Sequence, residues 1–327
     1  MAEQNEIIAK YDISEEQKEK IFNSIIQNLT LGIEPVENPV AVIVGGQTGA
    51  GKSGLMAYSH KMFDNKTFLA YDGSDYAGRW IKGNVIQIED DEFRAYFPNE
   101  RQIALEHPDE YIQITNKLTN ELTAKIFQYC AENKYNIIFH QTLKNTRIAD
   151  DGIVKLKDLG YAIVVRALAV NEFESRMSMI ERCLGQIETK GYCRNVTTSD
   201  HDKTYNGMPD TLDYIEKNKR YDILQVFQRG KKVDEPLMVY TRINPESDKL
   251  KILSTFPYLL SFDMYFGFGS AKEAIEEIRE RAGKKFMENA EIRIGDAKRQ
   301  KGNESIKNQI AELEKKIESK NHYRAAN

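Results

Sequence analysis

The sequence predicts an α/β fold in which helices cover both faces of a mainly parallel sheet. Short β-branched runs alternate with longer helical segments through the middle of the chain, a pattern typical of parallel strands joined by crossover helices. A glycine-rich loop follows the first of these runs. Both ends of the chain are helical in pattern instead. We therefore expect one core domain, residues 39–265, with helical N- and C-terminal extensions at 1–38 and 266–327.

The composition is that of an ordinary globular protein. Of 327 residues, 41% are hydrophobic and 29% are charged, and the net charge is -4. A net charge this small does not favour a nucleic-acid partner. No apolar run reaches the roughly 18 residues of a membrane span, and the N-terminus has no signal-peptide pattern. We expect a cytoplasmic protein whose cysteines are reduced thiols in no metal-binding pattern: Cys130, Cys183 and Cys193.

The N-terminal extension has a helix start and a helical apolar pattern. Ser14 is a candidate N-cap, and Pro35 and Pro39 end the segment before the first strand. Between them, apolar residues recur at helical spacing: Ile21, Phe22, Ile25, Ile26 and Leu29.

Five runs in the core domain read as strands, and long helical segments such as 108–132 and 170–186 lie between them. The expected strands are 40–44, 84–88, 135–139, 162–169 and 237–242. Ligands of such sheets bind at the carboxyl ends of the strands. Residues that follow a strand are therefore the candidates for a functional site.

The C-terminal extension is highly charged and favours helix. Its apolar residues follow a 4-3-4 spacing: Ile306, Ile310, Leu313 and Ile317. This spacing indicates either a short coiled-coil-like seam or a helical hairpin that packs on the body.

The glycine-rich loop fits the phosphate-loop pattern G-x-x-x-x-G-K-[ST], with the sequence Gly46-Gln47-Thr48-Gly49-Ala50-Gly51-Lys52-Ser53. It lies between a buried strand and a helix that starts near Lys52. Its backbone N–H groups and the helix N-terminus can bind a phosphate chain. Lys52 would reach the outer phosphates, and the Ser53 hydroxyl would bind Mg²⁺. The loop thus predicts the three-layer fold of P-loop NTPases and kinases, with ATP or GTP and Mg²⁺ bound.

Acidic residues follow the second expected strand, in the run Glu89-Asp90-Asp91-Glu92. A carboxylate there could take a proton from a substrate hydroxyl, or the run could simply place acids at a helix N-terminus. His140, Gln141 and Thr142 follow the third strand and could bind a polar substrate. From its spacing alone, His140 also fits a satisfied histidine at a helix start.

Two arginines, Arg182 and Arg194, bracket the segment between Cys183 and Cys193. Arginines on a lid can stabilise the charge of a transferring phosphoryl group, although most arginines serve only as surface charges.

Several of these motifs, in this order, resemble the zeta-toxin family of P-loop kinases. The likeness covers about residues 39–245. It includes the phosphate loop and its strand, Asp90-Asp91-Glu92-Phe93-Arg94 (similar to G-D-x-[FL]-R), Ile137 to Leu143 (similar to I-E-G-T-L), the two arginines, and 221–229. His140 and Gln141 stand where the family has glutamate and glycine. The segment 63–83, which holds Trp80, is longer than is usual in the family and reads equally as a substrate wall or a surface excursion.

The resemblance implies a kinase that transfers the γ-phosphate of ATP or GTP to a hydroxyl of a UDP-N-acetylglucosamine-like nucleotide sugar. Such a protein is the toxin of a toxin–antitoxin system, and a small antitoxin blocks its nucleotide site. Asp91 would be the general base, and Lys52, Arg182 and Arg194 would stabilise the phosphoryl group. The residues implied to bind the acceptor are Arg94, His140, Gln141 and Thr142.

Three alternatives remain open from the sequence. The chain could be a kinase with a different nucleotide acceptor, an NTPase switch that acts with a protein partner, or a binding protein without catalysis. No aspartate ends the 135–139 strand, which disfavours an ordinary NTPase. The intact Lys52, Ser53 and Asp91 disfavour a purely binding role.

Overall fold

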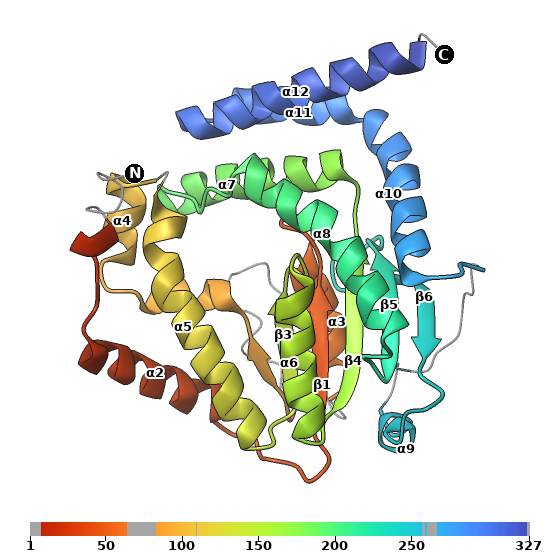
Figure 1. The fold of residues 1–327 in the computed structure, drawn as a ribbon. Coiled ribbons are helices and arrows are strands. Elements are labelled where there is room, and N and C mark those ends of the chain that lie inside the picture. The colour runs from red at the N-terminus through yellow and green to blue at the C-terminus, as the bar shows by residue number, and fades with distance from the viewer. Residues whose placement is uncertain (1–7, 64–82, 109, 257–258, 260–266, 326–327) are drawn as a thin grey trace.

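A computed structural model describes residues 8–63, 83–108, 110–256, 259 and 267–325 (Figure 1). The predicted substrate wall or surface excursion at 63–83, with Trp80, lies almost wholly outside these residues.

The core of the molecule is a six-stranded sheet with the order β2-β3-β1-β4-β5-β6. Neighbouring strands are parallel except β6, which is antiparallel to β5. The mainly parallel sheet is thus confirmed. One of its six strands, β5, is missing from the five strands expected from the residue pattern, although the family resemblance at 221–229 covers it. The strands are β1 (Val40–Gly45), β2 (Ile86–Ile88), β3 (Ile137–Gln141), β4 (Ala162–Ala169), β5 (Ile223–Gln228) and β6 (Leu237–Ile243).

Helices cover both faces of this sheet and extend beyond it. Among the described residues, no helix combines the length and the apolar character that crossing a membrane requires. The helices are α2 (Glu15–Thr30), α3 (Lys52–His60), the 3₁₀ helix η2 (Asp90–Tyr96), α4 (Glu100–Glu106), α5 (Tyr111–Glu132), α6 (Thr146–Asp158), α7 (Glu172–Lys190), α8 (Thr198–Lys217), α9 (Leu250–Leu253), α10 (Ala271–Met287), α11 (Ala290–Arg299) and α12 (Glu304–Ala325).

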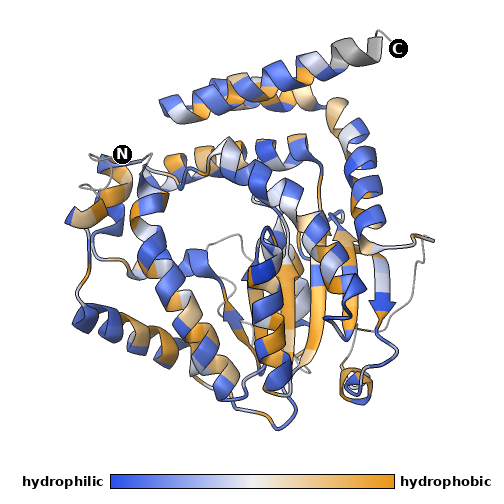
Figure 2. Ribbon diagram, in the orientation of Figure 1, coloured by the Kyte–Doolittle hydropathy of each residue, from blue (hydrophilic) through white to orange (hydrophobic). Residues whose placement is uncertain are grey.

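The layers follow from the alternation of side chains along each strand. On β1, Val42 and Val44 face α3 and form one hydrophobic cluster with it. Ala41 and Ile43 face the other way, into the larger cluster formed by α5, α6, α8 and α10. Strands buried on both faces are largely hydrophobic: β1 carries no polar side chain, as its colouring shows (Figure 2), and β4 is hydrophobic apart from the buried Arg166. The three-layer fold is therefore confirmed.

The N-terminal helix α2 begins as its sequence predicts. Ser14 caps it, and Gln17 reaches back to complete a capping box. Phe22, Ile25 and Ile26 are buried in the main hydrophobic cluster, against the layer that includes α5. The N-terminal segment therefore contributes to the main core.

The C-terminal helices pack on the body through the apolar seam of α12. Ile306, Ile310, Leu313 and Ile317 are all buried, in one cluster with α7 and α11. In Figure 1, α11 and α12 lie together beside α7. Arg176 on α7 adds an ion pair to Glu312 on α12. Of the two readings of this seam, packing on the body is the one observed.

We expect Leu313→Ala to loosen α12 from α7. Leu313 is 1% exposed, and truncating such a residue costs about 2–5 kcal/mol. Amide hydrogen exchange of α12 would report the loss, and the exposed neighbour Lys315 supplies a control variant, Lys315→Ala. If Leu313→Ala instead leaves hydrogen exchange in α12 unchanged but has a lower molecular mass than the unaltered chain by light scattering, the seam joins two copies of the chain.

Candidate functional site

The phosphate loop connects β1 to α3 through two residues in the left-handed region. Gly49 has φ +77° and Gly51 has φ +91°, a conformation that side chains disfavour. A Cβ on Gly49 would also come within 2.1 Å of the Ser175 carbonyl oxygen on α7. The loop therefore needs glycine at both positions, and it packs directly on α7.

Lys52 begins α3 and turns back over the loop. Its Nζ donates hydrogen bonds to the carbonyl oxygens of Gly46 (2.8 Å) and Gln47 (3.1 Å). Burial lowers the pKa of the Lys52 ammonium to about 8, against the opposing charges of Asp91 and Glu89. Lys52 thus lies over the loop, and its contact with the outer phosphates stays a prediction.

The other loop side chains divide between the body and the solvent. The Gln47 side chain is buried and donates to the Val170 carbonyl (2.7 Å), so it is directed into the body of the protein. Ser53, in the first turn of α3, is exposed. Thr48 and Ala50 complete the loop. Its predicted contacts with a nucleotide stay predictions.

Asp91 lies at the start of η2, directly after β2. Arg194 forms an ion pair with one carboxylate oxygen, and the Arg94 Nε lies 3.4 Å from the other. Burial alone would raise the pKa of Asp91, but Arg194, Arg94, His140 and Arg182 together lower it far below its usual value. Asp91 is therefore a carboxylate at neutral pH, and its charge is held by cations from several elements.

Arg94 is buried and acts as a brace for Asp91. Besides Asp91, its guanidinium binds Thr115 and, at 2.6 Å, the Asn116 Oδ1 on α5. Sequence reasoning missed these two partners, because nothing local links α5 to the acidic run. Binding of an acceptor by Arg94 stays a prediction.

His140 reaches the same edge of the sheet. The third strand runs two residues further than expected, so His140 and Gln141 end β3 and Thr142 follows it. The His140 Nδ1 lies 3.6 Å from the Asp90 Oδ1 and has no hydrogen bond to a described residue. The Nδ1 of His140, a residue predicted to bind the acceptor, thus points toward the acidic run that follows β2.

The two arginines come from α7 and the loop after it. Arg182 is exposed on α7, and its charge bears on the pKa values of both Lys52 and Asp91. Arg194 is half-buried against Asp91. Both arginines, the phosphate-loop lysine and the acid therefore share one region, as the sequence predicts.

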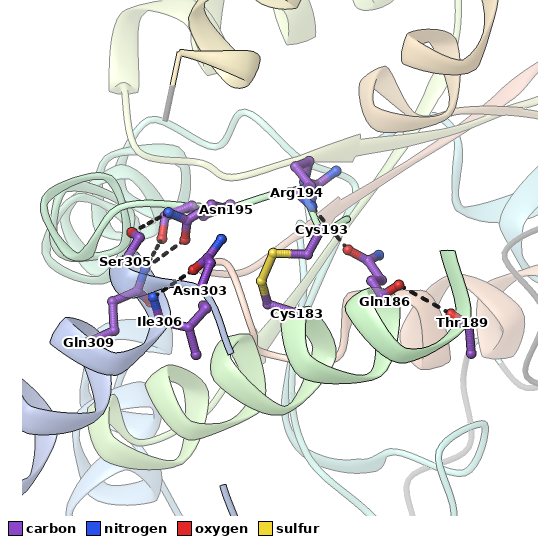
Figure 3. Close-up of a disulfide and its surroundings, with 11 residues drawn as sticks. Cys183, Gln186, Thr189, Cys193, Arg194, Asn195, Asn303, Ser305, Ile306 and Gln309 are labelled. Atoms are coloured by element: carbon purple, nitrogen blue, oxygen red, sulfur yellow. Dashed lines mark hydrogen bonds between the residues drawn. A yellow bond between two sulfur atoms is a disulfide. The ribbon is translucent and has the colours of Figure 1, made fainter. Parts of the chain in front are cut away.

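The loop that carries Arg194 is fastened at several points (Figure 3). Cys193 forms a disulfide with Cys183 on α7, with 5.0 Å between the Cα atoms. The Arg194 N–H donates to the Gln186 Oε1 (3.1 Å), and Asn195 accepts a hydrogen bond from Gln309 on α12 (2.7 Å). Arg194 is thus held in place from α7 and α12.

The disulfide corrects the expectation that every cysteine is a reduced thiol. Only Cys130 is free. The pairing depends on Gly191, which caps α7 in the left-handed conformation (φ +84°) and turns the chain back along the helix. Sequence spacing does not reveal that reversal.

A further attachment joins the loop that carries Arg194, which we call the arginine loop, to α4 and α5. Glu100 accepts hydrogen bonds from Tyr192 (2.8 Å) and from Tyr111 (2.5 Å). Both tyrosines fall outside any motif of the sequence, so they were not predicted.

The site suits a metal ion that arrives with a nucleotide. No group of three or more His, Cys, Asp or Glu side chains that could hold a metal occurs among the described residues. The exposed Ser53 hydroxyl could supply one oxygen ligand, and the charges of Glu89 and Asp90 act on the pKa of Lys52. Mg²⁺ commonly takes one or two protein oxygens and completes its shell with phosphates and water.

The sequence model of the family described as Zeta toxin matches residues 24–235. Toxin zeta of Streptococcus pyogenes is 22% identical over 219 residues, 67% of this chain and 70% of the relative. Toxin PezT of Streptococcus pneumoniae is 22% identical over 207 residues, 63% of this chain and 75% of the relative.

Two solved structures share the fold. One, from the PezAT chromosomal toxin-antitoxin system of Streptococcus pneumoniae, has a TM-score of 0.58 and 18% identity, with 85% of this chain and 98% of that chain covered. The other, AvrRxo1-ORF1:-ORF2 with ATP, has a TM-score of 0.52 and 13% identity, with 91% and 88% covered.

We expect one reactive thiol, that of Cys130, when the unreduced protein is unfolded and titrated. The bridge closes a short loop, so the double variant Cys183→Ser/Cys193→Ser should lose about 2–3 kcal/mol of unfolding free energy. A reductant should destabilise the unaltered chain and leave the double variant unchanged. Three titratable thiols would contradict the disulfide.

Nucleotide affinity should fall as the pH rises through the pKa of Lys52. The ammonium must keep its proton to attract phosphate, and its pKa is lowered to about 8. Binding of MgATP measured from about pH 7 to about pH 9 should therefore weaken steadily, whereas Lys52→Arg, which stays charged, should show a flat profile. An equal pH dependence in both proteins would assign it to another group.

Proposed function

Because the chain belongs to the zeta toxin family, a family of phosphotransferases, we propose that it is a small-molecule kinase. It transfers the γ-phosphate of ATP or GTP to a hydroxyl of a nucleotide sugar of the UDP-N-acetylglucosamine type. In this proposal it is the toxin of a toxin–antitoxin pair and acts in the cytoplasm.

The observation that carries the proposal is the Asp91–Arg194 pair beside the phosphate loop. A kinase needs a carboxylate to receive the proton of the acceptor hydroxyl, and cations to stabilise the phosphoryl group that the oxygen attacks. Asp91 stays ionised, and Arg194 lies against it. Charge from Lys52 and Arg182 reaches the same carboxylate.

In the proposed reaction, each group has one task. The loop N–H groups and Lys52 bind the outer phosphates of the donor. Arg182 and Arg194 offset the negative charge that spreads over the phosphoryl oxygens. Ser53 would help to hold a Mg²⁺ that arrives with the donor, and the ion would supply positive charge to offset that of the phosphates. Asp91 orients the acceptor hydroxyl and takes its proton, while Arg94, through Thr115 and Asn116, keeps Asp91 in position.

The neighbouring solved structures support the donor and the partner in this proposal. AvrRxo1-ORF1:-ORF2 was solved with ATP, and the PezAT structure comes from a toxin-antitoxin system. By analogy of fold, we propose a nucleotide donor and a small antitoxin that covers the nucleotide site.

A second candidate is a kinase with a different nucleotide acceptor. His140 favours it, because an imidazole, unlike the glutamate of the family motif, cannot act as a paired carboxylate acceptor for sugar hydroxyls. The Nδ1 of His140 is buried, has no hydrogen-bond partner among the described residues and lies 3.6 Å from the Asp90 Oδ1, so this side of the site differs in polarity from the family motif. Gln141 and Thr142 would contact the same part of the acceptor.

Asp91→Asn should lower kcat by about 10²–10⁴-fold, because it keeps the shape of the carboxylate and removes its basicity. Purified protein, ATP or GTP, and Mg²⁺ would be incubated with UDP-sugars, free nucleotides and dinucleotides, and the mass shift of the acceptor recorded. Glu92→Gln removes a neighbouring acid and serves as the control.

Phosphate on the UDP-N-acetyl sugar supports the proposed acceptor, and transfer to another nucleotide supports the second candidate. Near-normal kcat in Asp91→Asn would remove Asp91 from the role of base. Slow hydrolysis with no phosphorylated acceptor would favour an NTPase switch.

A further inference from the structure

Arg229 joins the phosphate loop to α7. It is the first residue after β5, at the carboxyl end of the sheet, and its side chain is 31% exposed. Its Nε donates to the Ala50 carbonyl (2.9 Å), and its Nη2 donates to the Gly49 carbonyl. The same guanidinium binds Glu174 (3.0 Å) on α7.

The two carbonyl contacts restrict the direction of the loop N–H groups. A trans peptide is planar, so its C=O and the next N–H point in opposite directions. Because Arg229 holds the Ala50 carbonyl on its own side, the Gly51 N–H is aimed to the opposite side. The Ala50 N–H closes the turn within the loop, on the Gln47 carbonyl (3.1 Å). Anion-binding loops of this kind need their N–H groups aimed inward and their carbonyls outward.

The contacts with α7 involve the helix face that carries Arg182. Glu174 and Ser178 both bind Arg229, the latter at 3.1 Å, and Arg182 follows at the same four-residue spacing. Residues four apart lie on one face of a helix. Arg229 thus fixes the phosphate loop against the stripe of α7 that ends in Arg182.

We propose that Arg229 is a positioning residue that sets the phosphate loop for triphosphate binding and sets Arg182 at its working distance from that loop. The proposal rests on the proposed function only in taking a nucleoside triphosphate as the donor. Arg229 acts through the loop and α7, and it is not assigned a place at the reacting atoms.

The first test is binding of MgATP, MgGTP and the two monophosphates to the full chain, by calorimetry and without an acceptor. Arg229→Ala should weaken triphosphate binding about tenfold, the effect of losing a charge-assisted hydrogen bond, and change monophosphate binding by less than about twofold. Arg229→Lys should fall between the two, since it keeps the charge but cannot span both carbonyls and Glu174.

Arg293→Ala is the matched control. Arg293 also pairs with a glutamate of α7, Glu181, at 2.9 and 2.6 Å, and within the described part of the chain none of its contacts reaches the phosphate loop. It should lower thermal stability without changing the ratio of triphosphate to monophosphate affinity. If Arg229→Ala behaves in the same way, Arg229 is only a structural brace and the proposal is overturned.

The second test is a double-mutant cycle with Arg182→Ala, read as kcat. If Arg229 positions Arg182, the decrease in kcat of the double variant should be smaller than the two single decreases combined. Fully additive decreases would overturn the claim that Arg229 positions Arg182. The binding test needs no acceptor. An unaltered triphosphate affinity in Arg229→Ala therefore rejects the positioning role while the kinase proposal stands. If Arg229→Ala loses triphosphate affinity but the unaltered chain phosphorylates no acceptor, the kinase proposal is rejected and the positioning role of Arg229 stands.

Discussion

The ion pair between Asp91 and Arg194 is the constraint on which the site depends. A carboxylate that is only 25% exposed is costly unless cations and hydrogen bonds compensate it. Here the compensation comes from four side chains: Arg94 of η2, Arg182 of α7, Arg194 of the loop after α7 and His140 of β3. Each cation must itself be held, which explains why Thr115 and Asn116 bind Arg94. The electrostatics of one acid therefore determines the local structure of its neighbours.

Helix α7 connects the Asp91–Arg194 pair to the phosphate loop and to the C-terminal helices. Its N-terminal half packs on the phosphate loop and binds Arg229, and its C-terminal half carries Arg182 and the disulfide that fixes the arginine loop. On its outer side it buries the apolar seam of α12. The C-terminal helices thus lie outside the sheet, yet they support the arginine loop through Asn195 and Gln309. Their packing explains how a segment remote from the phosphate loop contributes to the site.

Features set by local pattern were predictable from the sequence, and features set by distant contacts were not. The phosphate loop, the N-cap at Ser14 and five strands follow from short-range signals. β5 was not among the strands expected from the residue pattern, so Arg229, the first residue after it, was not chosen as a candidate site residue. Inspecting the residues that follow each strand would have selected Arg229 if β5 had been expected. The disulfide requires the chain reversal at Gly191, and the brace of Arg94 requires α5 to lie beside η2. Neither arrangement leaves a periodic signal in the sequence.

The lowered pKa of Asp91 has a consequence for the proposed reaction. A carboxylate whose pKa is depressed by cations is a weak proton acceptor, while catalysis favours a base whose pKa lies nearer the working pH. Arg194 is attracted by two anions in turn: Asp91 in this structure and the transferring phosphoryl group in the proposed reaction. In the proposed reaction, a shift of the guanidinium toward the phosphoryl oxygens would weaken its hold on Asp91 and raise the pKa of Asp91. One movement of one arginine would then both stabilise the phosphoryl group and strengthen the base, so the loop must be firmly anchored yet leave the Arg194 side chain free to turn.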